Sequence, residues 1–324
     1  MKTRIWLNLD PQKVDVSYLY QKFDEMGCSF EAEAIPGNDP KLLVEKAKNV
    51  DVVLATMEPW NEETLGAVKG QVRFIQKYGT GVDSVDLRAA GKNGIPVANI
   101  PGENAPAVAE VAMLHILNLG RRFSHCVQGC REGVWPSTIT GNELDGKTVG
   151  LAGYGRIARN LARMMSGFSV DIIAYDPFVK EAAPGQKVRF VESLEELFEQ
   201  SDIVSLHMPY GPSTAGIINK SLFDRMKDGA YFVNTCRGGV VNEPDLVEAL
   251  KNGKLAGAGL DVLTAEPPKT DEPLLHMENV YVTSHMGAAS LESEHRSQVF
   301  MADNVAAFLA GKLPDSVRNK EFLK

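Results

Sequence analysis

The sequence of 324 residues predicts an α/β fold with two doubly wound parallel sheets. Short runs rich in β-branched and apolar residues alternate with helix-length segments, which is typical of βαβ units. Most of these runs are continuously apolar, as expected for strands that helices cover on both faces. The chain is long enough for about two domains, so we expect two such sheets, each in its own domain.

The first part of the chain contains three predicted strands, at residues 4–9, 51–57 and 72–76. Their sequences, RIWLNL, DVVLATM and VRFIQ, are short and rich in the residue types that favour strands. Helix-length segments separate them. We therefore expect the first domain to begin with a parallel sheet.

The chain breaks at Pro101 and Gly102, and Asn104 or a neighbour is suited to cap a following helix. The segment 107–120, AVAEVAMLHILNLG, is apolar apart from one Glu, one His and one Asn. It is also shorter than the segment needed to span a bilayer. We therefore expect a core helix here.

Residues 120–146 interrupt the alternating pattern, and we expect an irregular arm or the edge of a lid. Six further strands are predicted at residues 148–153, 170–176, 202–208, 230–235, 257–262 and 280–284. A final helix follows at about 290–312 and is expected to return to the first domain. The predicted domains are therefore 1–99 plus 290–324 and 100–289.

Charge and composition exclude several classes of protein. The formal net charge is -8, and no stretch is dense in Lys and Arg, so nucleic acid is not an expected partner. The first residues, MKTRIWLNLD, enter a strand-like run without an apolar segment or a small-residue cleavage site. We therefore expect no signal peptide and a cytoplasmic protein that does not interact with membranes.

The four cysteines, Cys28, Cys126, Cys130 and Cys236, are irregularly spaced. They predict reduced thiols and no disulfide framework. The sequence HCVQGC places His125 within about one helical turn of two of these cysteines. A structural zinc site needs a fourth ligand and commonly a paired CxxC, so we predict no metal site.

The segment 147–165 has the pattern of a dinucleotide-binding turn: a strand, then Gly153-x-Gly155-x-x-Ala158, then a helix. Gly153 permits the tight turn, Gly155 lets the backbone approach a pyrophosphate, and the small Ala158 allows close packing of helix on strand. The helix N-terminus offers N–H groups to the phosphates. Asp176 ends the next strand and suits ribose hydroxyls while repelling a 2′-phosphate, which predicts NAD as the cofactor.

Three ionisable residues follow predicted strands, at the edge where parallel α/β sheets bind ligands. Arg237 provides a fork for a carboxylate. His285 can exchange a proton near neutral pH, and Glu266 can fix its tautomer. Together these residues predict the reduction of a 2-oxo acid by hydride.

Each of these residues has a simpler explanation when taken alone. Arg237 could cap a helix or form a salt bridge, Glu266 could be a solvated loop acid, and His285 could be a packed residue at a strand end. Cys236 is an alternative nucleophile, which would need an activated thiolate and a base within reach. The two glycines that follow Arg237 in NTCRGG are expected to let backbone and cofactor approach closely.

A series of motifs occurs from about residue 70 to the C-terminal helix: KYGTGVDSVDL, VANIPGENAPAVAE, GKTVGLAGYGRIAR, DIVSLHMP, VNTCRGGVVNEPDLVEAL, GAGLDVLTAEPP and VTSHMGAAS. In this order they resemble the D-isomer-specific 2-hydroxyacid dehydrogenases, a family that includes phosphoglycerate, glyoxylate and hydroxypyruvate enzymes. The resemblance implies two Rossmann-like domains, one flavodoxin-like and one NAD-binding, with an interdomain cleft. It also implies a homodimer to which the irregular arm contributes contacts.

The resemblance assigns Arg237 to the substrate carboxylate, Glu266 to pairing with the histidine, and His285 to catalytic acid/base work. Substrate binding is expected at Lys77, Tyr78, Gly79, Thr80, Gly81 and Arg237. Cofactor binding is expected at Thr80, Gly153, Gly155, Arg156, Ile157, Asp176, Met208, Thr235, Cys236, Arg237, Asp261, His285, Met286, Gly287 and Ala288.

Three positions depart from the family pattern. Ala158 replaces a third glycine, Met208 stands where a hydroxyl residue is common, and Ser284 stands where proline is frequent. None of them removes a catalytic group. The chain also ends near residue 324, so the C-terminal regulatory domain of some phosphoglycerate dehydrogenases is not expected.

The sequence therefore predicts an NAD-dependent dehydrogenase that moves hydride between nicotinamide and a small D-2-hydroxy acid or 2-oxo acid. It would resemble a D-3-phosphoglycerate dehydrogenase or a glyoxylate/hydroxypyruvate reductase. The alternative is an NAD-sensing, corepressor-like binding protein with little turnover. Lys77 leaves the substrate open, because it could meet a second anion such as a phosphate or be a solvated lysine at a strand end.

Overall fold

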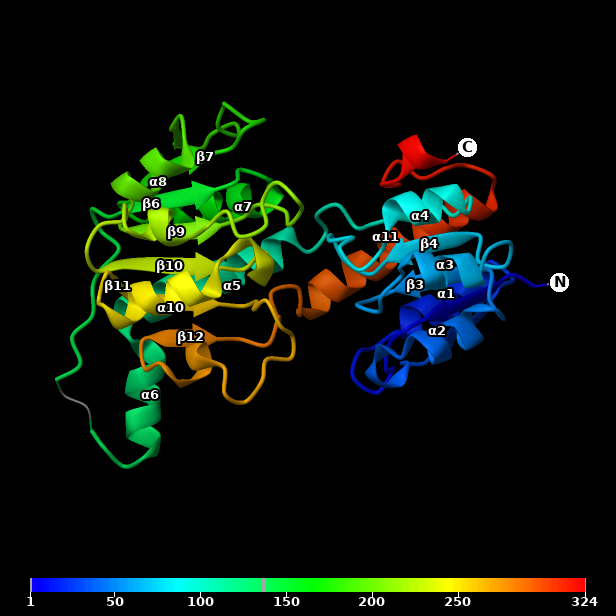
Figure 1. Cartoon of the computed structure of the whole chain (residues 1–324), viewed down its shortest axis with the longest axis horizontal. Coiled ribbons are helices and arrows are strands. Elements are labelled where there is room, and N and C mark those ends of the chain that lie inside the picture. Colours follow the sequence, from blue (N-terminus) through cyan, green and yellow to red (C-terminus); the bar gives the residue numbers. More distant parts are fainter. Residues whose placement is uncertain (1, 136–137, 324) are drawn as a thin grey trace. The chain divides into compact units, whose positions relative to one another are not determined.

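Parallel β-strands form two separate sheets in the computed structural model of the chain, which describes residues 2–135 and 138–323. The sheets belong to two structural units (Figure 1). The first unit combines Met1–Asn104 with Ser290–Lys324, and the second is Ala105–Ala289. The predicted fold class, two α/β domains with parallel sheets, is confirmed.

The sheet of the first unit has the strand order β2-β1-β3-β4-β5, which is the flavodoxin-like order. Its strands are β1 (Arg4–Leu7), β2 (Ser29–Ala32), β3 (Val52–Ala55), β4 (Phe74–Lys77) and β5 (Val97–Ala98). Its helices are α1 (Ser17–Glu25), α2 (Pro40–Ala47), α3 (Glu62–Ala67), α4 (Leu87–Lys92) and α11 (Leu291–Leu309), with 3-10 turns at Pro36–Asn38 and Lys320–Phe322.

Alternating side chains of the first sheet supply a hydrophobic core on each face. In β1, Ile5 and Leu7 join the core to which α1 and α11 contribute, whereas Trp6 joins the core to which α2, α3 and α4 contribute. From α11, Met301 and Val305 are fully buried in the first of these cores. The last helix of the sequence therefore helps to complete the first unit.

The sheet of the second unit has seven strands in the order β12-β11-β10-β9-β6-β7-β8, all parallel. Its strands are β6 (Thr148–Ala152), β7 (Asp171–Tyr175), β8 (Arg189–Phe190), β9 (Ile203–Leu206), β10 (Ala230–Asn234), β11 (Leu255–Leu260) and β12 (Val280–Val282). Its α-helices are α5 (Ala105–Arg121), α6 (Phe123–Arg131), α7 (Arg156–Met164), α8 (Leu194–Gln200), α9 (Lys220–Phe223) and α10 (Glu243–Lys251). Its 3-10 turns are Met165–Gly167, Gly238–Val240 and Pro273–His276.

Helices cover both faces of this second sheet. On one face, Ile116 of α5 and Leu161 of α7 pack against Val149 and other strand residues. On the other face, α8, α9 and α10 contribute to a second core that includes Val204 and Phe232. The strand order reverses between β6 and β9, which is the point where doubly wound sheets bind ligands at their carboxyl edge.

Side chains that accept a backbone N–H cap the starts of most helices. These caps are Asp39 for α2, Asn61 for α3, Asp86 for α4, Ser193 for α8, Asn219 for α9, Asn242 for α10 and Ser290 for α11. Each satisfies a donor that the helix leaves unpaired. The start of α7 differs, because its N-cap is Gly155, which has no side chain to do this.

Four elements were not predicted from the sequence. Three of them, β2, β5 and β8, are edge strands of their sheets, where a strand has one neighbour and needs no long apolar run. The fourth is α6, in the stretch 120–146 for which irregular structure is expected; none of its residues is buried, so no apolar stripe marks it. Residues 136 and 137 of that stretch lie outside the described residues.

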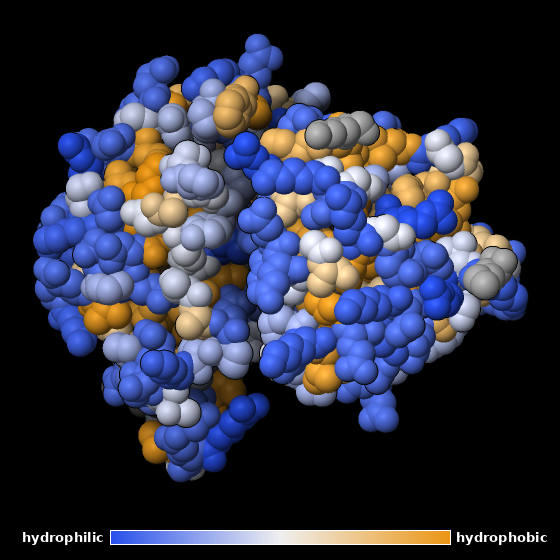
Figure 2. All heavy atoms as spheres, turned by 45° about the vertical axis from the view of Figure 1, so that its right-hand side comes forward, coloured by the Kyte–Doolittle hydropathy of each residue, from blue (hydrophilic) through white to orange (hydrophobic). Residues whose placement is uncertain are grey.

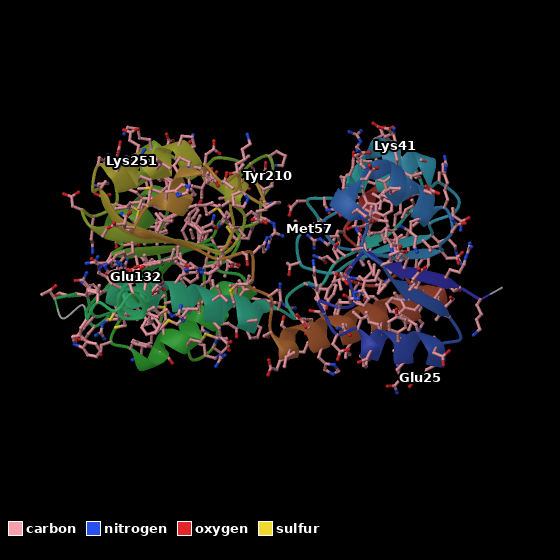
Figure 3. The ribbon with its side chains drawn as sticks, turned by 90° about the horizontal axis from the view of Figure 1, so that it is seen from below. Glu25, Lys41, Met57, Glu132, Tyr210 and Lys251 are labelled. Atoms are coloured by element: carbon pink, nitrogen blue, oxygen red, sulfur yellow. The ribbon has the colours of Figure 1, made fainter. Side chains whose placement is uncertain are left out.

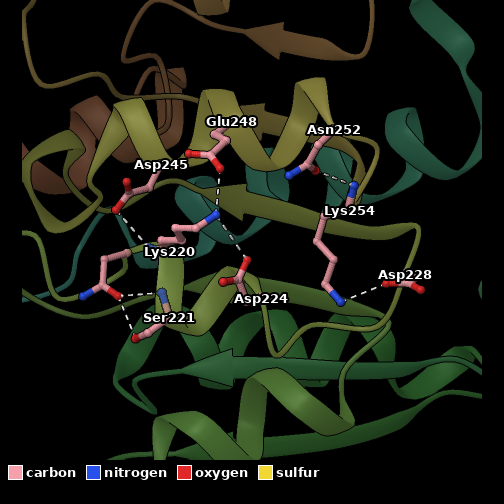
Figure 4. A network of polar contacts seen from close by, with 9 residues as sticks. Lys220, Ser221, Asp224, Asp228, Asp245, Glu248, Asn252 and Lys254 are labelled. Carbon is pink, nitrogen blue, oxygen red and sulfur yellow. Dashed lines mark hydrogen bonds and ion pairs between the residues drawn. The ribbon is translucent and has the colours of Figure 1, made fainter.

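Hydrophilic side chains dominate the face drawn in Figure 2, with hydrophobic residues in scattered patches between them. In the second unit, Nζ of Lys220 lies 2.7 Å from Glu248 of α10 and 3.7 Å from Asp224 (Figure 4). These pairs are exposed and screened by water, so they add little stability. Within residues 2–135 and 138–323, no helix is long and apolar enough to cross a bilayer.

Candidate active site

Three strand ends of the second unit carry the charged side chains of the candidate site. Arg237 follows β10, Glu266 follows β11, and His285 follows β12. These strands are parallel neighbours in the sheet, so their carboxyl ends lie at one edge. The fold therefore brings these three sequence-predicted residues to a common edge.

His285 and Glu266 are hydrogen-bonded to each other. Nδ1 of His285 lies 2.6 Å from Oε2 of Glu266, and the two side chains are 36% and 30% exposed. A carboxylate only accepts hydrogen bonds, so Nδ1 carries the hydrogen of this contact. The pair therefore fixes the ring and its tautomer, and leaves Nε2 as the nitrogen for proton exchange.

The second oxygen of Glu266, Oε1, accepts the backbone N–H of Leu263 at 3.0 Å. Burial alone would raise the pKa of Glu266, but the hydrogen bond and charge of His285, the N–H of Leu263 and the charge of Arg237 outweigh it. The net result is a pKa below the usual value for a glutamate. Glu266 is therefore ionised at neutral pH.

Arg237 is half-buried beside this pair. One of its terminal nitrogens, Nη1, donates to the carbonyl oxygen of Cys236 at 2.7 Å, and its own carbonyl accepts Nδ2 of Asn234 at 3.0 Å. These bonds hold the turn that follows β10. A guanidinium presents its donors in a fork that matches a carboxylate, so Arg237 is suited to an anionic ligand.

The two glycines after Arg237 approach other protein segments closely. A Cβ on Gly238 would lie 2.0 Å from the backbone carbon of Leu263, and a Cβ on Gly239 would lie 2.7 Å from the ring of Tyr210. Tyr210 lies on the loop after β9 (Figure 3). We expected these glycines to let the cofactor approach closely. In the described structure, they instead let protein backbone and an aromatic ring approach closely.

The glycine-rich turn after β6 has the features of a dinucleotide site. Gly153 has a φ of 94°, and a Cβ there would lie 2.7 Å from the carbonyl oxygen of His207. A Cβ on Gly155 would meet nothing within 4 Å, so open space adjoins the start of α7. The first N–H groups of this helix, at Arg156 and Ile157, suit a pyrophosphate.

Asp176, the residue after β7, contacts the same turn. Its Oδ2 accepts the N–H of Tyr154 at 2.8 Å, and its Oδ1 accepts the N–H groups of Phe178 and Val179 at 2.8 and 3.0 Å. Ala158 is fully buried within the core between α7 and the sheet. The carboxylate therefore lies beside the glycines, where the ribose of a bound dinucleotide is held.

Buried polar atoms without a protein partner lie at the ends of β9 and β10. In the part of the chain that the structure describes, Oγ1 of Thr235 and both ring nitrogens of His207 have no hydrogen-bond partner. Leu206 of β9 pairs with Asn234 of β10, so His207 and Thr235, the residues that follow them, lie at neighbouring positions. Burial lowers the pKa of His207 to about 3, which keeps it neutral. Such groups fit a bound polar ligand, and Met208 is half-buried beside them.

Asp261, one of the expected cofactor-binding residues, is 1% exposed and organises the turn that carries His285. Its carboxylate accepts Oγ1 of Thr283 at 2.6 Å and the N–H groups of Met286 and Gly287 at 2.9 and 2.8 Å. The next residue, Ala288, is exposed. Asp261 therefore has a structural task that the sequence did not indicate.

Cys236 lies in the site but is poorly suited to act as a nucleophile. It is 9% exposed, and its Sγ lies 3.1 Å from Oδ1 of Asn234. Burial raises the pKa of its thiol to about 11, so the reactive thiolate is scarce at neutral pH.

The predicted substrate loop belongs to the first unit, after β4. The carbonyl of Gly79 accepts the N–H of Ile100 at 2.9 Å, and that of Thr80 accepts Nδ2 of Asn99 at 2.6 Å. In the described residues, the N–H groups of Gly79, Thr80 and Gly81 donate no hydrogen bond to the protein. The loop is thus anchored by its carbonyls.

Lys77 ends β4 and Tyr78 follows it. Lys77 is 4% exposed and its Nζ donates to Oγ of Ser84 at 3.0 Å. The alternative of a solvated strand-end lysine is therefore wrong. Tyr78 packs against the core, and burial raises its pKa to about 12.

Outside this site, His125, Cys126 and Cys130 lie on α6. Among the described residues, no group of three or more His, Cys, Asp or Glu is placed to hold a metal ion. The four cysteines are free thiols.

A histidine poised for proton exchange on the sheet that holds a dinucleotide turn is the arrangement of a nucleotide-dependent dehydrogenase. Residues 113–287 match the family model described as D-isomer specific 2-hydroxyacid dehydrogenase, NAD binding domain. The chain belongs to the D-isomer-specific 2-hydroxyacid dehydrogenase family, and the predicted NAD cofactor and dehydrogenase class are confirmed.

Similar proteins carry the names of several enzymes of this family. The chain is 36% identical to the hydroxypyruvate reductase of Blautia hydrogenotrophica over 289 residues, covering 87% of this chain and 89% of the relative. It is 35% identical over 291 residues to the D-3-phosphoglycerate dehydrogenase of Methanocaldococcus jannaschii, covering 89% of this chain and 55% of that protein. The crystal structure of a glyoxylate reductase from Paecilomyes thermophila superposes with a TM-score of 0.86 at 26% identity, covering 99% of both chains. These names give no support to the corepressor-like alternative.

Two residues that contact the site were not singled out as functional from the sequence. Thr283 lies against Asp261, and His115 of α5 lies against Thr283. The sequence signal for His115 was a histidine inside a largely apolar helix. A side chain of this kind is more often a packed core residue, so the pattern could not identify it.

Proposed function

We propose that the protein reduces a small 2-oxo acid to the D-2-hydroxy acid at the expense of NADH, and that Arg237, Glu266 and His285 are its catalytic residues. The observation that carries the proposal is the hydrogen bond between His285 and Glu266 beside Arg237, at the carboxyl edge of the NAD-binding sheet. A proton donor, its orienting acid and a carboxylate clamp are what this reduction requires.

In this mechanism, Arg237 and the N–H groups of Gly79 to Gly81 hold the substrate carboxylate. Protonated His285 gives the proton on Nε2 to the carbonyl oxygen as hydride reaches the carbonyl carbon. Glu266, ionised because its pKa is lowered, stabilises the imidazolium before the transfer. In the oxidative direction, the same nitrogen takes the hydroxyl proton.

NADH supplies the hydride when bound. The N-terminus of α7, with Gly153, Gly155, Arg156 and Ile157, is suited to its pyrophosphate, and Asp176 is suited to the adenine ribose. Met208, Thr235, Cys236, Asp261 and residues 285–288 are proposed to line the nicotinamide side, with Thr80 from the first unit. Asp176 favours NAD over a cofactor with a 2′-phosphate because like charges repel.

We propose an unphosphorylated acid, such as hydroxypyruvate or glyoxylate, as the substrate. The phosphoglycerate alternative would need a second anion site, and Lys77, the side chain that could have supplied it, is buried with its ammonium group on Ser84. The names of the hydroxypyruvate and glyoxylate relatives agree with this choice.

The test is NADH oxidation with glyoxylate, hydroxypyruvate, pyruvate and phosphohydroxypyruvate, ranked by kcat/KM. We expect hydroxypyruvate or glyoxylate to rank first. Preference for phosphohydroxypyruvate would overturn the substrate assignment, and the absence of turnover with every acid would overturn the proposed activity. Complete loss of turnover in a folded Cys236→Ser variant would instead favour a cysteine nucleophile.

We also propose that the two domains have different roles. We further propose that the protein is a homodimer and that it is located in the cytoplasm. Residues 1–99 plus 290–324 would form the substrate domain and 100–289 the NAD-binding domain. Helix α6 supports the dimer, because none of its residues is buried and Phe123 is 61% exposed. Four free thiols suit the reducing cytoplasm.

A further inference from the structure

The turn that carries His285 has an unfavourable backbone conformation. His285 has a φ of 53°, in the left-handed region that side chains other than glycine rarely adopt. Its N–H donates to the carbonyls of Asp261 and Thr283 at 2.9 and 3.1 Å. Such a conformation persists only where the surrounding structure holds it.

The carboxylate of Asp261 holds this turn on both sides of His285. Before the histidine it accepts the hydroxyl of Thr283, and after the histidine it accepts the N–H groups of Met286 and Gly287. A Cβ on Gly287 would lie 2.9 Å from Oδ2 of Asp261. The turn therefore closes tightly around one buried carboxylate.

Thr283 joins this carboxylate to a second buried group. Its hydroxyl has one hydrogen, which it donates to Oδ1 of Asp261 at 2.6 Å. Nε2 of His115 therefore donates a hydrogen bond to Oγ1 of Thr283, at 3.2 Å. His115 is 2% exposed, and burial lowers its pKa in spite of the charge of Asp261. It is therefore neutral, with its hydrogen on Nε2.

The strand beneath this contact is shaped to admit the imidazole. A Cβ on Gly259 of β11 would lie 2.7 Å from Cβ of His115 and 2.8 Å from its Nδ1. Gly259 lies two residues before Asp261, so both face the same side of the strand. The missing side chain at 259 lets α5 bring His115 close to the strand.

We propose that His115 and Thr283 are positioning residues, which act through Asp261 to hold the turn that presents His285 to Glu266. The proposal rests on the proposed role of His285 as the proton donor. It assigns a task in catalysis to one buried and one half-buried polar side chain, His115 and Thr283, that would touch neither substrate nor reacting atoms. The hydrogen bonds from His115 to Thr283 and from Thr283 to Asp261 carry it.

The test removes the hydroxyl and keeps the shape of the side chain, as in Thr283→Val. We expect kcat to fall about tenfold, because Asp261 loses a donor and the turn loosens, while the Kd for NADH changes less than about threefold. Amide hydrogen exchange at residues 284–288 should be faster in the same variant. Thr283→Ser keeps the hydroxyl and should restore both readouts.

A matched control is Ser201→Ala, which removes a buried hydroxyl elsewhere in the second unit, one that donates to the carbonyl of Leu197 at 2.6 Å. It should lower thermal stability without changing kcat or the exchange at 284–288. His115→Phe should act in the same direction as Thr283→Val. The combined variant should lose little more than Thr283→Val alone, because the two residues act in series.

The proposal is overturned if Thr283→Val keeps wild-type kcat and wild-type exchange at 284–288. It is also overturned if the Val, Ser and Ser201→Ala variants lose activity alike, which would indicate general destabilisation. Failure of the wild-type protein to reduce any 2-oxo acid would instead overturn the proposed function. The exchange measurement would still decide whether Thr283 holds the turn.

Discussion

The chemistry of the site depends on charges that are fixed in different ways. Arg237 stays charged at every accessible pH, and Glu266 stays charged at neutral pH because His285, Leu263 and Arg237 stabilise its ionised form. His285 is the member that can donate and accept the proton, because Glu266 holds its ring and leaves Nε2 available. His285 can therefore exchange the proton while the charges of Arg237 and Glu266 stay the same.

Replacing Arg237 by glutamine should weaken substrate binding and lower turnover together. Arg237→Gln removes the bidentate fork, so we expect kcat/KM for the 2-oxo acid to fall on the order of 100-fold. The Kd for NADH should stay nearly unchanged. Arg225→Gln, at an exposed arginine of the same unit, is the control and should behave as wild type. Unchanged steady-state constants in Arg237→Gln would contradict the assignment.

Replacing Glu266 should shift the pH dependence of reduction. The pKa of Glu266 is lowered, so its favourable contribution is present above the usual glutamate range and is lost as pH falls through its lowered pKa. Glu266→Gln removes the negative charge that favours protonated His285. The fall of kcat/KM with rising pH should then occur at lower pH than in wild type. A superimposable pH profile would show that the pair does not control the proton.

At the scale of elements, the site is assembled by close approaches of backbone. The 3-10 turn after Arg237 lies against the loop after β11, since a Cβ on Gly238 would lie 2.0 Å from the backbone of Leu263 and 2.2 Å from that of Thr264. These two segments carry Arg237 and lead to Glu266. Contact between them sets the distance between the arginine and the acid.

Gly238→Ala should therefore disturb stability and activity at once. The added methyl group collides with backbone that cannot rotate away, so we expect a loss of more than about 2 kcal/mol in the free energy of unfolding. Urea denaturation measures this loss, and kcat should fall with it. Gly167→Ala, where a Cβ meets nothing within 4 Å, should change the free energy of unfolding by less than about 1 kcal/mol. Equal stability of the two variants would contradict the close contact.

The strands that the sequence predicted are those with an apolar run. The central strands are apolar and α5 is largely so because most of their residues are buried in the two cores of the second unit. The edge strands β2, β5 and β8 and the exposed helix α6 have no such pattern. Their formation depends on neighbours that the local sequence does not reveal.

At the scale of the whole molecule, α6 is an α-helix with no buried residue in the part of the chain that the structure describes. Figure 1 shows it extending away from the sheet of the second unit. Phe123, Val134 and Trp135 of this region are 61%, 57% and 85% exposed. Large apolar side chains exposed at both ends of one helix support the proposed interface.

Phe123→Asp should therefore convert a homodimer to a monomer. A charge at an apolar interface is buried without a partner on association, which opposes dimer formation. Sedimentation velocity measures the change, at several protein concentrations. Leu313→Asp, at an exposed leucine of the first unit, should leave the dimer intact. A monomeric wild-type protein, or a Phe123→Asp variant that stays dimeric, would contradict the proposal.

The sequence by itself determined the α/β class, the dinucleotide turn and the three charged residues of the site. These features are local, because a strand, a glycine turn and a residue just beyond a strand are each encoded within a short window. Tertiary structure decided that Lys77 is buried on Ser84, that Gly238 contacts the loop before Glu266, and that His115 and Thr283 lie behind Asp261. Those contacts join residues far apart in the chain, and only packing brings their atoms together.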